Sequence, residues 1–252
     1  MDNFILKPTH RLDDLQNKNM KIWQDTSEFC FGMDAVLLAD FAASKMKNKD
    51  VSADLCTGNG IIPLLIYARV NKLDMTAVEI NPETAELAKY NMHYNGVEES
   101  INVVCDDVKR FARNNLNKFD AITVNPPYIP IGHGFTSQKS SVSTARHEVE
   151  LTLEELLHSC CMLLKDKGRM FMVHRAHRAA EAIALMQRHR IEAKTITFIH
   201  PKKGEEANLF LVEGVKNAGH WLKVTEPLIV YNDDGSYTDM IHEIYKRGHK
   251  DE

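Results

Sequence analysis

The chain has 252 residues, enough for one generous α/β domain with short extensions but not for two full domains. Its composition, with 44% hydrophobic and 26% charged residues, is that of an ordinary folded protein and excludes a largely disordered chain. The formal net charge of −4 argues mildly against a large nucleic-acid footprint.

The sequence carries no signal for a membrane, for secretion or for a metal. Residues 61–67 form the most apolar stretch and are too few to cross a bilayer, and residues 1–11 lack the apolar core of a signal peptide. The five cysteines form no CxxC pair, so neither a zinc site nor a disulfide framework is indicated. We therefore expect a cytoplasmic protein without a bound metal.

The predicted elements begin with a hairpin, with strands over 13–16 and 20–23, followed by a helix over 34–46. From residue 51 onward we expect strands over 51–55, 75–80, 101–105, 119–124, 169–173, 195–199 and 208–213, and helices over 61–70, 82–94, 152–164 and 176–190. This alternation favours an α/β fold with a mainly parallel seven-stranded sheet, helices on both faces and a closing antiparallel pair. Residues 1–48 are expected to pack on the core as an extension, and residues 49–252 to form one globular unit.

A glycine turn follows the first strand of the alternating region. Asp54-Leu55-Cys56-Thr57-Gly58-Asn59-Gly60 leads directly into a helix, and ligands of open α/β sheets bind beside this turn. Its two glycines let a ligand approach without meeting a Cβ atom. The next strand ends near Glu79, whose carboxylate can accept hydrogen bonds from both hydroxyls of a ribose. Turn and carboxylate together indicate a cofactor that contains a nucleoside.

The residues after the turn distinguish between two such cofactors. The dinucleotide fingerprint GxGxxG requires a third glycine, but Pro63 and Leu64 occupy that region. Ile61 and Ile62 open the helix, and this bulky apolar pair favours a cofactor without phosphates. We therefore predict S-adenosylmethionine, with Asp54 receiving its amino group.

The fourth strand of this region leads into Asn125-Pro126-Pro127-Tyr128. The two prolines fix φ and remove two N–H donors, which leaves the Asn125 side-chain oxygen and the Pro126 carbonyl as rigid acceptors. Two acceptors that bind the hydrogens of an exocyclic amine favour the charge that develops on its nitrogen during attack on a sulfonium methyl group. Stacking on Tyr128 would hold the substrate ring in line. We therefore assign catalysis to these four residues.

The chain resembles the amino-group methyltransferases with the motif (Asp/Asn)-Pro-Pro-(Tyr/Phe/Trp). Within them it looks like the bacterial tRNA adenine-N6 methyltransferases that modify position 37 of a valine tRNA. The matching segments are FGMDAVLLA (31–39), DLCTGNGIIPLLI (54–66), VEINPETAELAKYN (78–91), NPPYIP (125–130), ARHE (145–148) and FIHPKKGEEANLFLVEG (198–214).

This resemblance implies a Rossmann-like class I methyltransferase fold and methyl transfer to N6 of an adenine in tRNA. The residues expected to bind S-adenosylmethionine are Asp54, Cys56, Gly58, Gly60, Glu79, Ile80, Asp106, Asp107 and Asn125. Asp107 is preferred over Asp106 for the adenine amino group. The methyltransferases that the chain resembles have an aspartate followed by an aliphatic residue at this position. Capping of a helix is the alternative role of this aspartate. Cys56 stands where the family often has glycine, and a thiol there is expected to be tolerated at negative φ.

Two regions are expected to contact RNA. Residues 129–149 could close over the substrate as a lid, in which Arg146 and His147 would meet phosphates, with an exposed loop without function as the equal alternative. Between residues 174 and 203 stand seven basic residues, namely Arg175, Arg178, Arg188, Arg190, Lys194, Lys202 and Lys203, against two acidic ones. They predict a phosphate-contacting patch, with a solvated helix face as the alternative.

Other functions remain open from the motifs. A protein glutamine methyltransferase that acts on release factors would bind a carboxamide with the same two acceptors, and guanine-N2 methyltransferases use a related motif. The short segment before residue 51 favours RNA, because the glutamine enzymes carry a substantial N-terminal helical domain. A non-enzymatic nucleoside-binding protein would lack the acceptors or the ribose carboxylate, and both are present. No obligate protein partner is inferred.

Overall fold

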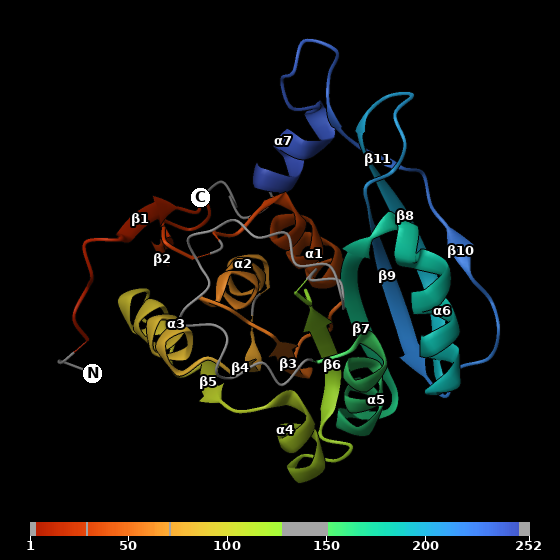
Figure 1. The fold of residues 1–252 in the computed structure, drawn as a ribbon, viewed down its shortest axis with the longest axis horizontal. Helices are drawn as coiled ribbons and strands as arrows, with labels where there is room; N and C mark the ends of the chain where they lie inside the picture. The colour runs from red at the N-terminus through yellow and green to blue at the C-terminus, as the bar shows by residue number, and fades with distance from the viewer. Residues whose placement is uncertain (1–3, 29, 71, 128–150, 247–252) are drawn as a thin grey trace, which may run out of the picture.

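The computed structural model describes residues 4–28, 30–70, 72–127 and 151–246. In this part of the chain a nine-stranded sheet is covered by helices on both faces, and a two-stranded hairpin lies beside it (Figure 1). No helix of the described ranges is both long and apolar enough to span a bilayer.

Seven strands form the body of the sheet, in the order β8–β9–β7–β6–β3–β4–β5. They are β3 (Val51–Leu55), β4 (Asp74–Glu79), β5 (Ile101–Cys105), β6 (Phe119–Val124), β7 (Leu164–Arg175), β8 (Ile191–Lys202) and β9 (Leu209–Lys216). Neighbouring strands run parallel except at β9, which is antiparallel to both β7 and β8. The predicted mainly parallel sheet with a closing antiparallel strand is therefore confirmed.

Two short strands were not predicted. β10 (Lys223–Val224) and β11 (Leu228–Tyr231) pair in parallel with β8, on the side of that strand that faces away from β9. They belong to the segment that follows the last long strand and lie against the edge of the sheet (Figure 1).

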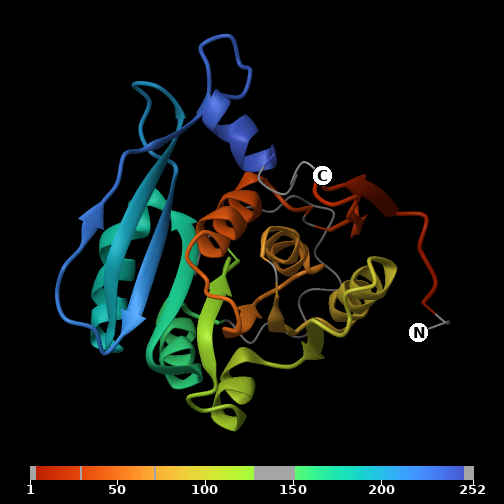
Figure 2. The same ribbon diagram turned by 180° about the vertical axis from the view of Figure 1, so that it is seen from behind.

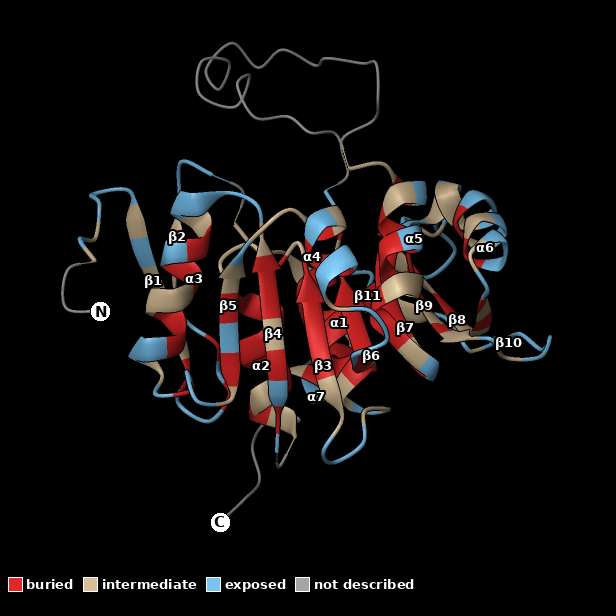
Figure 3. Cartoon of the chain, turned by 90° about the horizontal axis from the view of Figure 1, so that it is seen from below, coloured by how far each residue is buried: buried red, intermediate tan, exposed pale blue. Residues whose placement is uncertain are grey.

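The helices divide between the two faces of the sheet (Figures 1 and 2). One face carries α1 (Met33–Ala43), α2 (Ile61–Arg69), α3 (Pro82–Tyr94) and α7 (Asp239–Lys246), and the other carries α4 (Val108–Asn114), α5 (Leu153–Leu163) and α6 (Ala179–Arg188). Successive side chains of β7 point to opposite faces of the sheet: Phe171 packs with the first group of helices and Met170 with the second. Both faces are therefore apolar, as a parallel sheet requires, and Figure 3 shows β3 and β6 buried along nearly their whole length.

Helix α1 ends at Ala43, three residues before the predicted end at residue 46, and the helices also differ from the predictions elsewhere. Helix α4 was not predicted, and the helix expected over 176–190 begins with a 3-10 turn (Ala176–Arg178) before α6. Helix α4 has only seven residues, so it is too short to show an amphipathic period.

The N-terminal hairpin consists of β1 (His10–Asp14) and β2 (Lys21–Asp25). Its strands are shifted outward from the predicted ones because the connection is longer: Gln16, Lys18 and Asn19 all have positive φ. The hairpin lies against α3, where the side chain of Asn95 bonds both the N–H (3.0 Å) and the carbonyl (2.8 Å) of Lys21.

Candidate active site

The predicted cofactor residues and Asn125-Pro126-Pro127 meet at the edge of the sheet formed by the carboxyl ends of its parallel strands. Strand β3 pairs with β4 on one side and β6 on the other, both in parallel, and Leu55 lies opposite both Val78 and Val124. β4 in turn pairs with β5, with Glu79 opposite Cys105. The segments that follow these four strands therefore leave the sheet side by side, at the position where open α/β sheets bind ligands.

Cys56, the first residue after β3, has a φ of +58°. A thiol at this position was expected to be tolerated if φ were negative, and this condition is not met. The backbone turns here so that the N–H of Thr57 reaches the carbonyl of Val78, at 3.0 Å. The left-handed region costs a residue with a Cβ atom roughly 1–2 kcal/mol, so Cys56 holds the turn under strain.

The two glycines of the turn serve different purposes. Gly58 (φ +57°) has no atom within 4 Å of where a Cβ would lie, so its outer side is open to a ligand. A Cβ on Gly60 (φ +87°) would lie 2.4 Å from Cε of Met92 and 3.6 Å from Cβ of Ala88. Cε of Met92 is the end of a flexible side chain and can move, so it is the positive φ that requires glycine at residue 60.

The Glu79 carboxylate is held by two backbone groups. Oε2 accepts the N–H of Gly58 and Oε1 accepts the N–H of Asn81, both at 2.9 Å. Because each carboxylate oxygen has two lone pairs, both oxygens keep a free acceptor site for a ligand hydroxyl. The next residue, Ile80, is 48% exposed and offers an apolar surface directly beside this carboxylate.

Asp54 lies inside the structure and is fully buried. The hydroxyl of Thr123 donates to its Oδ1 at 2.6 Å, while Oδ2 makes no hydrogen bond within the described part of the chain. Burial raises the pKa of the Asp54 carboxyl from 3.8 to about 7, against the opposing effect of the Thr123 hydrogen bond. Contact between Asp54 and the amino group of a cofactor stays a prediction, since this carboxylate has no exposed surface here.

Asp106 and Asp107 follow β5. Oδ1 of Asp107 accepts the N–H groups of Lys109 (2.8 Å) and Arg110 (3.0 Å), so this aspartate caps α4, the alternative role considered for it. Asp106 forms an ion pair with Arg110, and its N–H bonds the carbonyl of Glu79 at 2.9 Å. This last bond ties the two acidic segments together.

Asn125 follows β6, and its side-chain Nδ2 donates to Oδ2 of Asp34 at 3.2 Å. Pro126 is buried and Pro127 is exposed. Tyr128, Arg146, His147 and the expected lid lie outside the described residues. Asp34 was not predicted as a site residue, although an aspartate within the apolar segment of α1 was a usable signal.

The basic residues do not form one patch. Arg175 ends β7 and Lys202 ends β8, and both strands run parallel to β6, so these side chains and Lys203 lie toward the same edge as Asn125. Arg190 precedes β8, whose 12 residues place it about 40 Å from Lys202 at about 3.3 Å per residue. Arg188 is paired with Glu154 at 2.8 Å.

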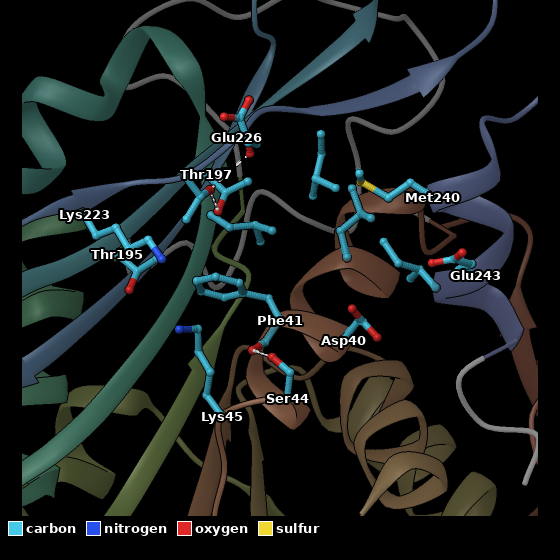
Figure 4. Close-up of a pocket in the computed structure, with 15 residues that line it drawn as sticks. Asp40, Phe41, Ser44, Lys45, Thr195, Thr197, Lys223, Glu226, Met240 and Glu243 are labelled. Carbon is cyan, nitrogen blue, oxygen red and sulfur yellow. Dashed lines mark hydrogen bonds between the residues drawn. The ribbon is translucent and has the colours of Figure 1, made fainter.

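A cavity of about 590 Å³ lies elsewhere, between α1, α7 and β8 (Figure 4). None of the predicted site residues lines it. Polar groups around it already bond one another: Lys45 pairs with Glu213 at 2.8 Å, and the hydroxyls of Thr197 and Thr225 are 2.7 Å apart. The edge of the sheet with the glycine turn is therefore the candidate active site.

No cluster of three or more metal-binding side chains occurs among the described residues.

Four features define a Rossmann-like methyltransferase: a mainly parallel sheet, a glycine turn after β3, an acidic residue at the end of β4 and Asn-Pro-Pro after β6. The chain belongs to the methyltransferase small domain family, which matches residues 32–199.

Individual relatives agree with this assignment. The chain is 27% identical to a tRNA1(Val) (adenine(37)-N6)-methyltransferase of Aliivibrio salmonicida, over 82% of this chain and 86% of that protein. It is 31% identical to a protein of the same name from Bacteroides fragilis, over 63% of this chain and 65% of the relative. A solved structure of a predicted O-methyltransferase from Agrobacterium tumefaciens has a TM-score of 0.69 at 24% identity and covers 86% of this chain and 97% of that one.

Proposed function

We propose that the protein transfers a methyl group from S-adenosylmethionine to the exocyclic N6 of an adenine in tRNA, at position 37 of a valine tRNA. The observation that carries this proposal is the meeting of the glycine turn, Glu79 and Asn125-Pro126-Pro127 at one edge of the sheet. The names of the relatives from Aliivibrio salmonicida and Bacteroides fragilis supply the nucleotide and the RNA.

The cofactor is S-adenosylmethionine, which supplies a methyl group on a sulfonium centre. The described residues fit its nucleoside half. The two oxygens of Glu79, each with one backbone donor, can accept the two ribose hydroxyls, and the open side of Gly58 leaves room for the ligand. Ile80 offers an apolar surface for the adenine ring, and Asp107 is the acceptor for its amino group, since the cap on α4 uses Oδ1.

Asn125 and Pro126 act on the substrate base. The amide oxygen of Asn125 and the carbonyl of Pro126 accept the two hydrogens of the adenine amino group. They stabilise the positive charge that develops on this nitrogen during transfer. The aromatic ring of Tyr128 stacks on the base and holds it in line, and the methylated product then loses a proton to water.

The RNA backbone is bound at the same edge of the sheet. Arg175 and Lys203 are exposed there, and Lys202 lies with them at the end of β8. An adenine of an anticodon loop is unpaired, so turning it out of its stack toward Asn125 costs less than flipping a paired base. Arg146 and His147 would bind further phosphates.

The decisive experiment uses labelled S-adenosylmethionine and three acceptors side by side: valine tRNA transcript, the same transcript with guanine at position 37, and a release-factor protein. We expect label only in the first transcript, recovered as N6-methyladenosine after digestion. The variant Asn125→Ala should lower kcat by at least about 100-fold while binding of S-adenosylhomocysteine persists. Label in the release factor would instead establish glutamine methylation, and label in the guanine transcript as N2-methylguanosine would establish the guanine reaction.

A further inference from the structure

Asp34, the second residue of α1, touches the catalytic asparagine without being part of the Asn-Pro-Pro motif. Its Oδ2 accepts a hydrogen bond of 3.2 Å from Nδ2 of Asn125, and the two residues are 91 positions apart in the sequence. We infer that Asp34 is a positioning residue that fixes the orientation of the Asn125 amide, so that the amide oxygen and not the NH2 group faces the substrate. This inference rests on the proposed function and deepens it.

The argument depends on what a carboxylate can do. An asparagine side chain has a donor end and an acceptor end of nearly the same shape, and rotation by 180° exchanges them. A carboxylate only accepts hydrogen bonds, so Asp34 binds the donor end and turns the oxygen of Asn125 away from itself. A flipped Asn125 would present its own NH2 group to the amino group of the base, where donor would face donor.

The surroundings keep the Asp34 carboxylate in place. The side chain is 7% exposed, and its Oδ1 accepts the N–H of Ala35 at 3.0 Å. A Cβ on Gly32 would lie 2.9 Å from Oδ1, so the absence of a side chain at residue 32 leaves the carboxylate its space. The position in the first turn of α1 also places the negative charge where the free N–H groups of a helix favour it.

An exchange of the two side chains tests the inference. Asp34→Asn allows either orientation of the Asn125 amide, and we expect kcat to fall about tenfold. Asn125→Asp places two carboxylates against each other, and kcat should fall at least about 100-fold. In the double variant the amide of residue 34 donates to the carboxylate of residue 125, whose second oxygen remains an acceptor. We expect its kcat to be at least about tenfold above that of Asn125→Asp alone.

Two measurements separate positioning from a loss of structure. Asp40→Asn is the matched control, because Asp40 is a second buried aspartate of α1 and contacts Arg69 (3.7 Å) instead of Asn125; its kcat should stay within about twofold of wild type. The side-chain amide resonance of Asn125, assigned by its absence in Asn125→Asp, should move in Asp34→Asn and not in Asp40→Asn.

The outcomes are distinct. A double variant no faster than Asn125→Asp, or an Asn125 resonance that does not move in Asp34→Asn, overturns the inference. Lack of turnover by the wild-type protein on every RNA tested would overturn the proposed function alone, since the amide resonance reports on the Asp34–Asn125 pair without a substrate.

Discussion

The side chain of Asn91 bonds both backbone groups of Trp23. Its oxygen accepts the N–H at 2.8 Å, and its nitrogen donates to the carbonyl at 3.0 Å. The same nitrogen donates to the carbonyl of Asn59 at 2.9 Å, within the glycine turn. One buried amide on α3 thus joins the N-terminal hairpin to the turn that we assign to the cofactor.

Replacement of this residue should affect both partners. Asn91→Ala leaves buried backbone groups without a hydrogen bond, and we expect the free energy of unfolding to fall by about 1–3 kcal/mol. The affinity for S-adenosylhomocysteine should also fall, because the turn loses a support at Asn59. Urea denaturation and calorimetric titration measure the two effects. Asn95→Ala is the control: it releases Lys21 but not the turn, so an equal loss of ligand affinity in this variant would refute the coupling.

The positive φ of Cys56 leads to a second prediction. Cys56→Gly should be more stable than Cys56→Ala by about 1 kcal/mol, because both variants lack the thiol and only glycine adopts this conformation without strain. Thermal unfolding of the two variants is sufficient to test this. Equal melting temperatures would mean that the turn is not strained at this residue.

Asp54 should make stability depend on pH. Its pKa is about 7 in the folded protein against 3.8 as the ordinary value, so between these pH values the folded state keeps a proton that the unfolded state releases. The contribution of this group to the free energy of unfolding therefore falls as pH rises from about 4 to 7. We expect Asp54→Asn to resemble wild type near pH 4 and to be the more stable protein at pH 8. If wild type is the more stable at pH 8, the Asp54 carboxyl does not have a raised pKa.

The separation of the basic residues predicts unequal effects on RNA binding. Charge reversal at Arg175 or Lys203 should weaken tRNA affinity and lower the slope of log affinity against log salt by about 1 for each phosphate that the variant no longer binds. Charge reversal at Arg190, at the other end of β8, should change neither. Filter binding over a series of salt concentrations measures both quantities. Equal effects at Arg175 and Arg190 would argue for the continuous patch expected from the sequence.

Much of this architecture was predictable from local patterns. The strands over 51–55, 101–105 and 119–124 match the prediction to the residue, because each is a short, mostly apolar stretch between polar or turn-forming residues. Motif spacing then placed Glu79 and Asn125 at the ends of β4 and β6, the two strands on either side of β3. β8 was predicted too short, since its first part includes charged residues: Glu192 pairs with Val215, and Lys194 lies at an irregularity in the pairing with β9.

What the sequence did not reveal depends on pairing between distant residues. β10 has two residues and β11 has four, and both exist only through pairing with β8. The bond between Asp34 and Asn125 crosses 91 residues and has no local pattern.

The short strands β10 and β11 have a consequence for how copies of the protein behave toward each other. β8 would otherwise present a long row of unpaired N–H and C=O groups, a template on which a second chain could add a strand. Residues 223–224 and 228–231 occupy that row opposite residues 195–196 and 199–202. The C-terminal segment thus blocks the addition of a second chain along β8. A chain that lacks this segment would be prone to aggregate even with an intact active site.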